Sequence, residues 1–233
     1  RQTVFTTIPM GIVVAQNAVI TVCLEDSIIL RSIAEGAVKG VHTSLKTRFV
    51  FQILLRIAGR FLKNLRMIER DFTRIEKRLY DSLKNEELIQ LLGLSKSLVY
   101  FSSSLKGNEV TMEKVLRGRV LKLYEDDRDI LEDALIEVRQ AIEMANIYSG
   151  ILSGTMDAFA SVISNNLNIV MKFLATVTIV MSIPTMVASF YGMNVNSRGM
   201  PFANHPYGFV IVLGFALALS LLVAYIFNKK DLF

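Results

Sequence analysis

Mostly small or polar residues recur at steps of three and four along one long segment of the chain whose only charged residue is Lys172. The set comprises Asn168, Met171, Ala175, Thr178, Ser182, Thr185, Ser189 and Gly192. Such steps place residues on one face of a helix. If copies of this face surrounded a water-filled path, their hydroxyl and amide oxygens could replace part of the hydration shell of an ion. The alternative is an ordinary contact between membrane helices, where small residues let backbones approach closely.

The acidic stretch YEDDRDILEDALIE, residues 124–137, is a second candidate site. Asp126, Asp129 and Asp133 follow one another at i, i+3 and i+7, so they share one helical face. Hard divalent cations such as Mg²⁺ are bound by carboxylates, often from more than one element. The stretch therefore predicts either a cytosolic sensor of divalent ions or a solvated acidic helix face.

No motif in the sequence indicates an enzyme. The chain has one cysteine and two histidines, without a glycine-rich phosphate loop or a supported Ser-His-Asp set. A single cysteine supplies neither a disulfide framework nor a cysteine-based zinc site. His205 stands alone in a loop, where a histidine is more often polar surface than a metal ligand. We expect no catalytic residue and no catalytic cofactor.

A stripe of basic residues recurs at steps of three and four between residues 56 and 74. Its members are Arg56, Arg60, Lys63, Arg66, Arg70 and Arg74. Such a stripe could bind nucleic acid. In a chain with membrane segments, a helix face turned to solvent or lipid headgroups is the favoured interpretation, so no nucleic-acid partner is predicted.

Two segments, uncharged apart from Lys172 at the start of the first, are long enough to cross a bilayer. The chain is 52% hydrophobic yet 20% charged, so its apolar residues must be concentrated. The segments around residues 172–192 and 207–227 each reach the roughly 20 residues needed to span the hydrocarbon core. Lys172, Lys229 and Lys230 form a basic inner mouth on one side, which the positive-inside rule assigns to the cytoplasm. We expect a multi-pass cell-membrane protein with both termini cytoplasmic.

The remaining sequence predicts a small sheet followed by long helices. Residues 1–35 contain two β-branched runs joined by AQNA, which predicts a hairpin. Two strands alone are marginal, so we interpret them as the remnant of a sheet whose other strands precede Arg1. Helical periodicity begins near Val41, and KGNE at residues 106–109 is expected to end the second helical stretch. From Thr111 onward the lack of strong breakers predicts one helix that continues into the membrane and needs partner helices.

The predicted fold class is an α+β membrane protein with a partial N-terminal α/β cytosolic domain. Its expected parts are a cytosolic α/β and helical domain truncated at its N-terminus (1–110), a long stalk helix (111–166), a first transmembrane pore helix (167–193), an external selectivity loop (194–206), a second transmembrane helix (207–228) and a cytosolic basic tail (229–233).

The segment SVISNNLNIVMKFLATVTIVMSIPTMVASFYGMN, followed by a short loop, a second span and a lysine-bearing C-terminus, resembles the CorA magnesium transporter family. The resemblance covers essentially the whole chain. It implies a homopentamer in a lipid bilayer whose first membrane helices line a pore for divalent cations. Mg²⁺ would be both the transported and the regulatory ion.

The resemblance also implies roles for single residues. Asn194 of the Gly-Met-Asn motif would offer a ring of amide oxygens at the outer mouth. Gly192 would allow the turn, Met193 would pack behind it, and Tyr191 would brace the loop. Further implied positions are Asn168 and Thr185 as polar pore positions, Met171 and Leu174 as a hydrophobic constriction, and Asp133 as the stalk acid of a regulatory site between subunits.

The loop MPFANHP departs from the family pattern, because it has phenylalanine where many members have an acid. From the resemblance as a whole we expect Mg²⁺ influx through a channel-like transporter gated by cytosolic divalent ions, with Co²⁺ and Ni²⁺ as further transported ions. Two alternatives stay open. One is a zinc transporter on the same scaffold, and the other is a non-conducting, membrane-anchored coiled-coil oligomer.

Overall fold

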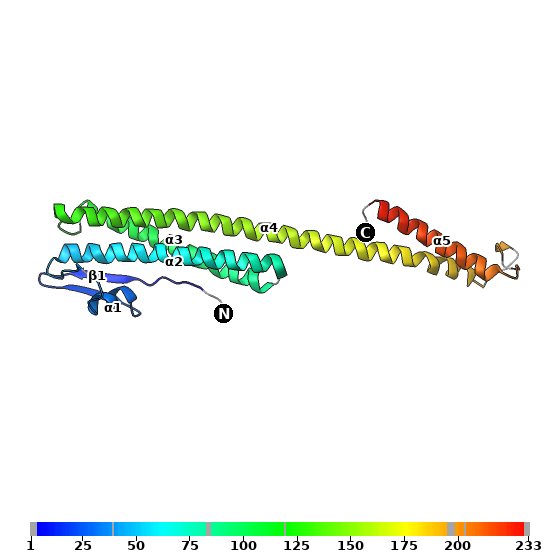
Figure 1. Cartoon of the computed structure of the whole chain (residues 1–233), viewed down its shortest axis with the longest axis horizontal. Helices are drawn as coiled ribbons and strands as arrows, with labels where there is room; N and C mark the ends of the chain where they lie inside the picture. The colour runs from blue at the N-terminus through cyan, green and yellow to red at the C-terminus, as the bar shows by residue number, and fades with distance from the viewer. Residues whose placement is uncertain are drawn as a thin grey trace. The chain divides into compact units, whose positions relative to one another are not determined.

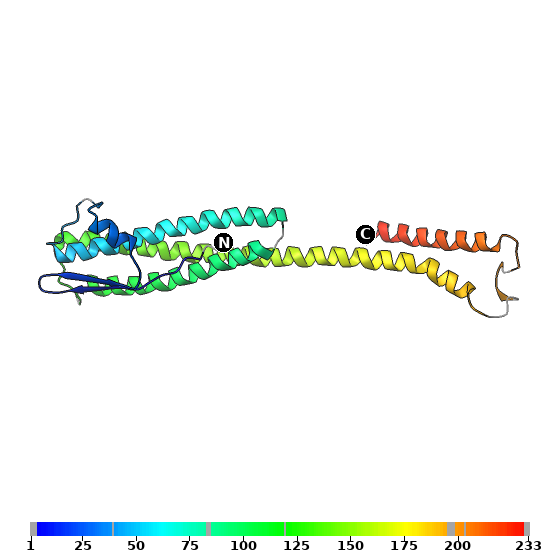
Figure 2. The same cartoon turned by 90° about the horizontal axis from the view of Figure 1, so that it is seen from below.

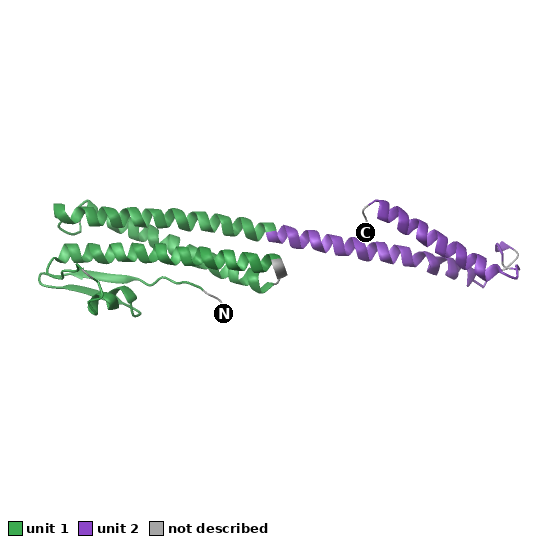
Figure 3. Cartoon of the chain, viewed as in Figure 1, with its two compact units in different colours: residues 1–158 green, residues 159–233 purple. Residues whose placement is uncertain are grey.

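The computed structural model describes residues 4–38, 40–82, 85–118, 120–194, 199–202 and 204–230. The elements in chain order are β1 (Met10–Val14), β2 (Val19–Cys23), α1 (Ile28–Ala34), α2 (Lys46–Ser82), α3 (Asn85–Leu116), α4 (Glu125–Tyr191) and α5 (Gly208–Lys229) (Figure 1). The chain divides into unit 1, residues 1–158, and unit 2, residues 159–233 (Figure 3). The predicted class, a small N-terminal sheet followed by a long helix and an apolar C-terminal helix, is confirmed.

The predicted hairpin is present. β1 and β2 pair antiparallel from Met10↔Cys23 to Val14↔Val19. The connection closes where the Ala15 amide donates to the Ala18 carbonyl at 2.8 Å. The four residues AQNA thus form the turn, as their position between two β-branched runs predicts.

The expectation of strand-rich structure up to residue 35 is wrong at its end, where α1 lies. Ser27 occupies the N-cap with extended backbone angles, and its Oγ accepts a bond from the Leu30 amide at 3.5 Å. A serine that satisfies a free amide of the first turn favours a helix start even before isoleucines of high β propensity.

Unit 1 is built on α2, α3 and the first part of α4. Apolar residues at steps of three and four give each helix a buried stripe. Leu65, Leu98 and Leu131, one from each helix, are no more than 1% exposed. α2 and α4 run in the same direction and α3 returns between them in sequence (Figures 1 and 2).

Two polar contacts fix the register of α2 against α4. The Arg48 Nε donates to Asp127 Oδ1 at 2.7 Å, and the Tyr148 hydroxyl donates to Glu69 Oε2 at 2.8 Å. Within each pair the two residues lie 79 positions apart in the sequence. An unchanged separation over about six turns means that the two helices are parallel and in step.

The long helix begins later than the sequence predicts. The stretch 106–109 does not end a helix, because α3 continues through it to Leu116. The chain turns instead at Gly118, whose φ of +70° lies in the left-handed region, and α4 starts at Glu125. A left-handed glycine is a common helix terminator, and acids in a first turn favour a helix start. The predicted start at Thr111 is therefore wrong.

Unit 2 contains the end of α4, the connecting loop and α5. Within the described residues, two helices, α4 and α5, are long and apolar enough to cross a membrane by length and composition. They meet through small side chains: Thr176, Ala216 and Ser220 are 4%, 3% and 7% exposed. Small residues at such a contact let two membrane helices approach closely.

Candidate functional site

The predicted polar face of α4 points away from α5. The contact with α5 is marked by Thr176, by Val180, whose carbonyl accepts from α5, and by Val187, which shares a cavity with α5. At 3.6 residues per turn, the set defined by Asn168 to Gly192 lies on the opposite side of the helix. We call this face the seam. Its members are exposed in the chain except Ser182, which is half-buried.

The seam hydroxyls donate their protons to the backbone of their own helix. Thr178 Oγ1 donates to the Leu174 carbonyl at 2.8 Å, Ser182 Oγ to the Ile179 carbonyl at 2.7 Å, and Thr185 Oγ1 to the Met181 carbonyl at 3.3 Å. A hydroxyl that donates inward keeps its lone pairs for other partners. The seam therefore presents hydrogen-bond acceptors, and a shallow hollow lined by Thr178, Ser182, Thr185 and Ser189 runs along it.

Two large apolar side chains accompany the polar ones at the other end of this face. Met171 and Leu174, the predicted constriction, are 57% and 53% exposed. Exposed apolar groups next to acceptors fit a narrow hydrophobic passage only if other copies of the helix close around them.

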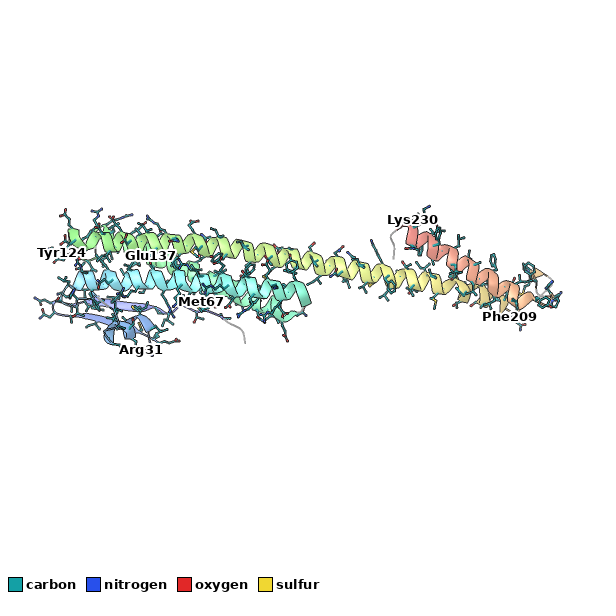
Figure 4. The ribbon with its side chains drawn as sticks, in the orientation of Figure 1. Arg31, Met67, Tyr124, Glu137, Phe209 and Lys230 are labelled. Atoms are coloured by element: carbon teal, nitrogen blue, oxygen red, sulfur yellow. The ribbon has the colours of Figure 1, made fainter. Side chains whose placement is uncertain are left out.

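The basic residues gather at one end of the helix pair. α4 and α5 are antiparallel and are joined where Ser220 meets Val180. Lys172 lies eight residues before Val180, and Lys229 lies nine residues after Ser220, so the two are nearly level. Lys230 follows directly and caps the end of α5 (Figure 4).

The connecting loop is tied to the end of α4 by Tyr191. Its hydroxyl donates to the Pro201 carbonyl at 2.9 Å, and the bracing role implied for Tyr191 stays a prediction. Asn194 is exposed. Residues 195–198 and 203 of the predicted selectivity loop lie outside the described part of the chain. Met193, for which a packing role behind the turn is implied, is 53% exposed in the chain.

Gly192 lies in the turn after α4, as expected, but its conformation does not require a glycine, whereas that of a second glycine does. The φ of Gly192 is outside the left-handed region, and an added Cβ would lie 3.4 Å from the Ala188 carbonyl oxygen, an ordinary contact. At Gly208, by contrast, a Cβ would lie 2.3 Å from the carbonyl oxygen of Phe202, whose φ is +60°. Sequence reasoning missed this pair, for which a glycine directly before the second apolar segment was the only signal.

The loop rests on an apolar cavity of about 490 Å³. The lining residues are Val187, Phe190, Tyr191, Pro201, Phe202, Ile211, Val212 and Phe215. Burial against these side chains, together with the Tyr191 bond, holds the two ends of the loop near the ends of α4 and α5.

The acidic candidates do not converge in one chain. Asp126, Asp129 and Asp133 are exposed along the start of α4. Within the described ranges, no three His, Cys, Asp or Glu residues are grouped so that they could hold a metal ion. Asp127 of the same stretch is instead buried and paired with Arg48, a structural role that sequence spacing did not separate from the others.

Glu137, on the same helix as Asp133, has a carboxylate oxygen that is buried without a hydrogen-bond partner among the described residues. This oxygen, Oε2, would lie 3.3 Å from a Cβ at Gly59 of α2. Burial, and second the negative charge of Asp133, raise the pKa of Glu137 above its ordinary value. Figure 4 shows Glu137 on the part of α4 that runs alongside α2.

Comparisons with known proteins agree on one family. Residues 2–230 match the model described as CorA-like Mg²⁺ transporter protein. The chain is 28% identical over 234 residues to the cobalt/magnesium transport protein CorA of Methanocaldococcus jannaschii, covering 97% of this chain and 72% of that protein. It is 28% identical over 146 residues to the cobalt/magnesium transport protein CorA of Thermotoga maritima, covering 58% of this chain and 41% of that protein.

The fold agrees with solved structures. The complete structure of the CorA magnesium transporter from M. jannaschii superposes with a TM-score of 0.79 at 23% identity, covering 95% of this chain and 75% of that one. Its soluble domain superposes with a TM-score of 0.53, covering 64% of this chain. At this identity the likeness establishes a shared fold.

Proposed function

The chain belongs to the CorA-like Mg²⁺ transporter family, and from that premise we propose that it forms an oligomeric path through which Mg²⁺ enters the cytoplasm across the cell membrane. The single observation that carries the proposal is the seam of α4, which is mostly small or polar, largely exposed and turned away from α5. A helix that served only as an anchor would not need such a face along its whole span.

The direction of the seam hydroxyls suits a hydrated cation. Mg²⁺ gives up its water reluctantly, and its bound waters point their hydrogens outward. The hydroxyls of Thr178, Ser182 and Thr185 have their own protons engaged by the backbone. Copies of the seam around one axis would therefore offer acceptors to the water shell, so the ion could pass without losing all of its waters.

Asn194 is proposed as the outer selectivity element. Its exposed amide follows the segment that Tyr191 fastens to the Pro201 carbonyl. A ring of neutral amide oxygens would hold a hydrated divalent ion through its waters. A ring of carboxylates would hold the ion more strongly and release it more slowly. Co²⁺ and Ni²⁺ are proposed as further permeant ions on the same grounds.

Membrane potential supplies the driving force in this proposal. Moving two positive charges inward across 100 mV releases about 4.6 kcal/mol, so no nucleotide site is needed. Met171 and Leu174 would form the constriction, which conducts when wide enough to be hydrated and blocks when narrow. The fivefold number of copies is carried over from the family resemblance, and mass measurement of the detergent-solubilised protein tests it.

The acidic start of α4 is proposed as the sensor of cytosolic Mg²⁺. Because Asp126, Asp129 and Asp133 do not converge within one chain, a bound ion would bridge them to a carboxylate of a neighbouring copy. Binding there would inhibit transport only if the closed state bound the ion better than the open state did.

Ion uptake into liposomes containing the full chain tests the proposal. We expect inward Mg²⁺ flux that follows the imposed potential. Asn194→Ala should abolish selective uptake and leave assembly intact, because it removes ion-facing oxygens and no buried group. Asn204→Ala, in the same loop, is the matched control and should behave like the wild type.

Each other outcome has a definite meaning. Wild-type uptake in Asn194→Ala would exclude the loop as the selectivity element. A marked preference for Zn²⁺ in ion competition would favour the zinc transporter alternative. Assembly without flux of any divalent ion would favour the non-conducting, membrane-anchored oligomer.

A further inference from the structure

We propose that Ser220 of α5 is a positioning residue for α4, because its hydroxyl replaces the hydrogen bond that Pro184 removes from that helix. The consequence for transport rests on the proposed function. The hydrogen bond itself does not, so the two can be tested separately.

Pro184 leaves a carbonyl of α4 without its intrahelical donor. The residue lies inside α4 and has no backbone N–H. The carbonyl four residues earlier, that of Val180, is the group that loses its partner. In a hydrocarbon environment no water replaces the lost donor, so the carbonyl must be satisfied by the protein.

Ser220 supplies the missing donor from the neighbouring helix. Its Oγ donates to the Val180 carbonyl at 2.7 Å. The site is closed, since Ser220 is 7% exposed and Ala216, one turn earlier on α5, is 3% exposed. No other serine or threonine occurs in the α5 sequence.

The hydrogen bond of Ser220 differs from those of the seam hydroxyls because it joins two helices. Thr178, Ser182 and Thr185 all donate to carbonyls of their own helix, the usual choice of a helical hydroxyl. Ser220 donates across the α4–α5 contact instead, to the one carbonyl that Pro184 leaves open. A bond of this kind fixes α5 to α4 at the point where proline weakens the backbone ladder.

The position of the bond predicts which transport parameter it affects. Val180 lies between the Met171–Leu174 constriction and the Asn194 mouth along α4, on the side opposite the seam. Ser220 therefore touches no permeating ion. Its loss would let α4 change its bend at Pro184, which alters how fast ions pass and leaves their recognition at Asn194 unchanged.

A double-mutant cycle in the full chain tests the hydrogen bond. Ser220→Ala removes the donor, and Pro184→Ala restores a backbone N–H for the Val180 carbonyl. In the wild-type background, Ser220→Ala should lower the melting temperature in detergent by about 2–4 °C. In the Pro184→Ala background the same change should have no effect. Ala216→Gly is the matched control, because it removes one carbon from the same contact and should have equal effects in both backgrounds.

Uptake of Mg²⁺ by Ser220→Ala in liposomes tests the positioning role. We expect the maximal rate to change about threefold or more, as loss of one hydrogen bond allows, with the half-saturating Mg²⁺ concentration unchanged. An altered half-saturating concentration at an unchanged maximal rate would overturn the positioning role.

Further outcomes of the melting, assembly and transport measurements separate the hydrogen-bond inference from the proposed function. Equal destabilisation by Ser220→Ala in both backgrounds would overturn the hydrogen-bond inference. If Ser220→Ala fails to assemble alone, assembly of the double variant supports the inference and its failure overturns it. If the wild-type chain carries no Mg²⁺, the proposed function fails, while the melting cycle still tests the bond.

Discussion

The two units of the chain divide polar and apolar side chains in opposite ways. In unit 1 large apolar groups form a buried core, in which Leu65 and Leu98 are 0% and 1% exposed. In unit 2 they lie outside, with Met181 at 68% and Leu221 at 71%. The buried positions there include Thr176 and Ser220. An apolar surface of this extent requires lipid or further copies of the chain to cover it.

The difference means that different residue types and different forces hold the two units together. Burial of leucine away from water drives the packing of α2, α3 and α4. Lipid chains are as apolar as leucine, so that force is absent between α4 and α5. Close approach of small residues and the Ser220–Val180 hydrogen bond take its place.

Matched leucine truncations, one in each unit, should show the largest difference between the two units. Leu98→Ala in unit 1 should lower the free energy of unfolding by about 2–5 kcal/mol, because it leaves a cavity in a closed core. Leu221→Ala in unit 2 should change it by less than about 0.5 kcal/mol. Denaturant unfolding of the detergent-solubilised chain measures both, and losses of equal size would contradict the comparison.

Neutralising the acidic start of α4 would separate sensing in unit 1 from conduction in unit 2. The triple change Asp126→Asn, Asp129→Asn and Asp133→Asn should raise the internal Mg²⁺ concentration that halves uptake by about tenfold, a coupling of about 1.4 kcal/mol. Selectivity should not change. The readout is uptake into liposomes loaded with graded Mg²⁺.

Glu132→Gln is the control for that experiment, because Glu132 is in the same stretch but pairs with Arg128 at 2.7 Å. An unchanged inhibition curve in the triple variant would make the stretch a solvated face. The next carboxylate to test would then be Asp157, which is exposed and is the only charged residue between Glu143 and Lys172.

The smallest expected effect concerns Glu137 of unit 1, whose Oε2 is buried. Because the pKa of Glu137 is raised, the folded chain holds this proton more tightly than the unfolded chain. Its contribution to stability is therefore present below the ordinary carboxyl pKa and is lost as pH rises through the raised value. Glu137→Gln should remove this slope and raise the melting temperature at neutral pH by about 1–2 °C.

Thermal melts between pH 4 and pH 7 measure this effect, with Glu143→Gln, an exposed acid on the same helix, as control. Equal pH slopes for the wild type and Glu137→Gln would show that the buried Oε2 is compensated by solvent.

Sequence patterns predicted those parts of the structure that depend on local chemistry. The hairpin followed from AQNA between β-branched runs, and the two membrane-length helices followed from the lack of charge. Sequence patterns did not predict the start of α4, because a single glycine such as Gly118 is tolerated within a helix. Only the left-handed φ of Gly118 shows that the chain turns there.

The seam was predicted as a face of oxygen-bearing side chains, but the direction of its hydroxyl protons was not. Spacing places Thr178 and Thr185 on one side of a helix, yet it does not show which way their protons point. The Ser220–Val180 bond joins residues 40 positions apart. Its existence depends on how α5 packs on α4, which no local pattern encodes.

The shared separation of 79 residues for Arg48–Asp127 and Glu69–Tyr148 restricts how this gene can change in length. Deleting one residue of α2 between Arg48 and Glu69 turns the rest of that helix by about 100°. The two contacts could then not both survive unless α4 lost a residue over the matching interval. Insertions at residues 117–124, which join α3 to α4, disturb neither contact. Among homologous genes, lengths should therefore vary freely in that joining segment and change in α2 and α4 only together.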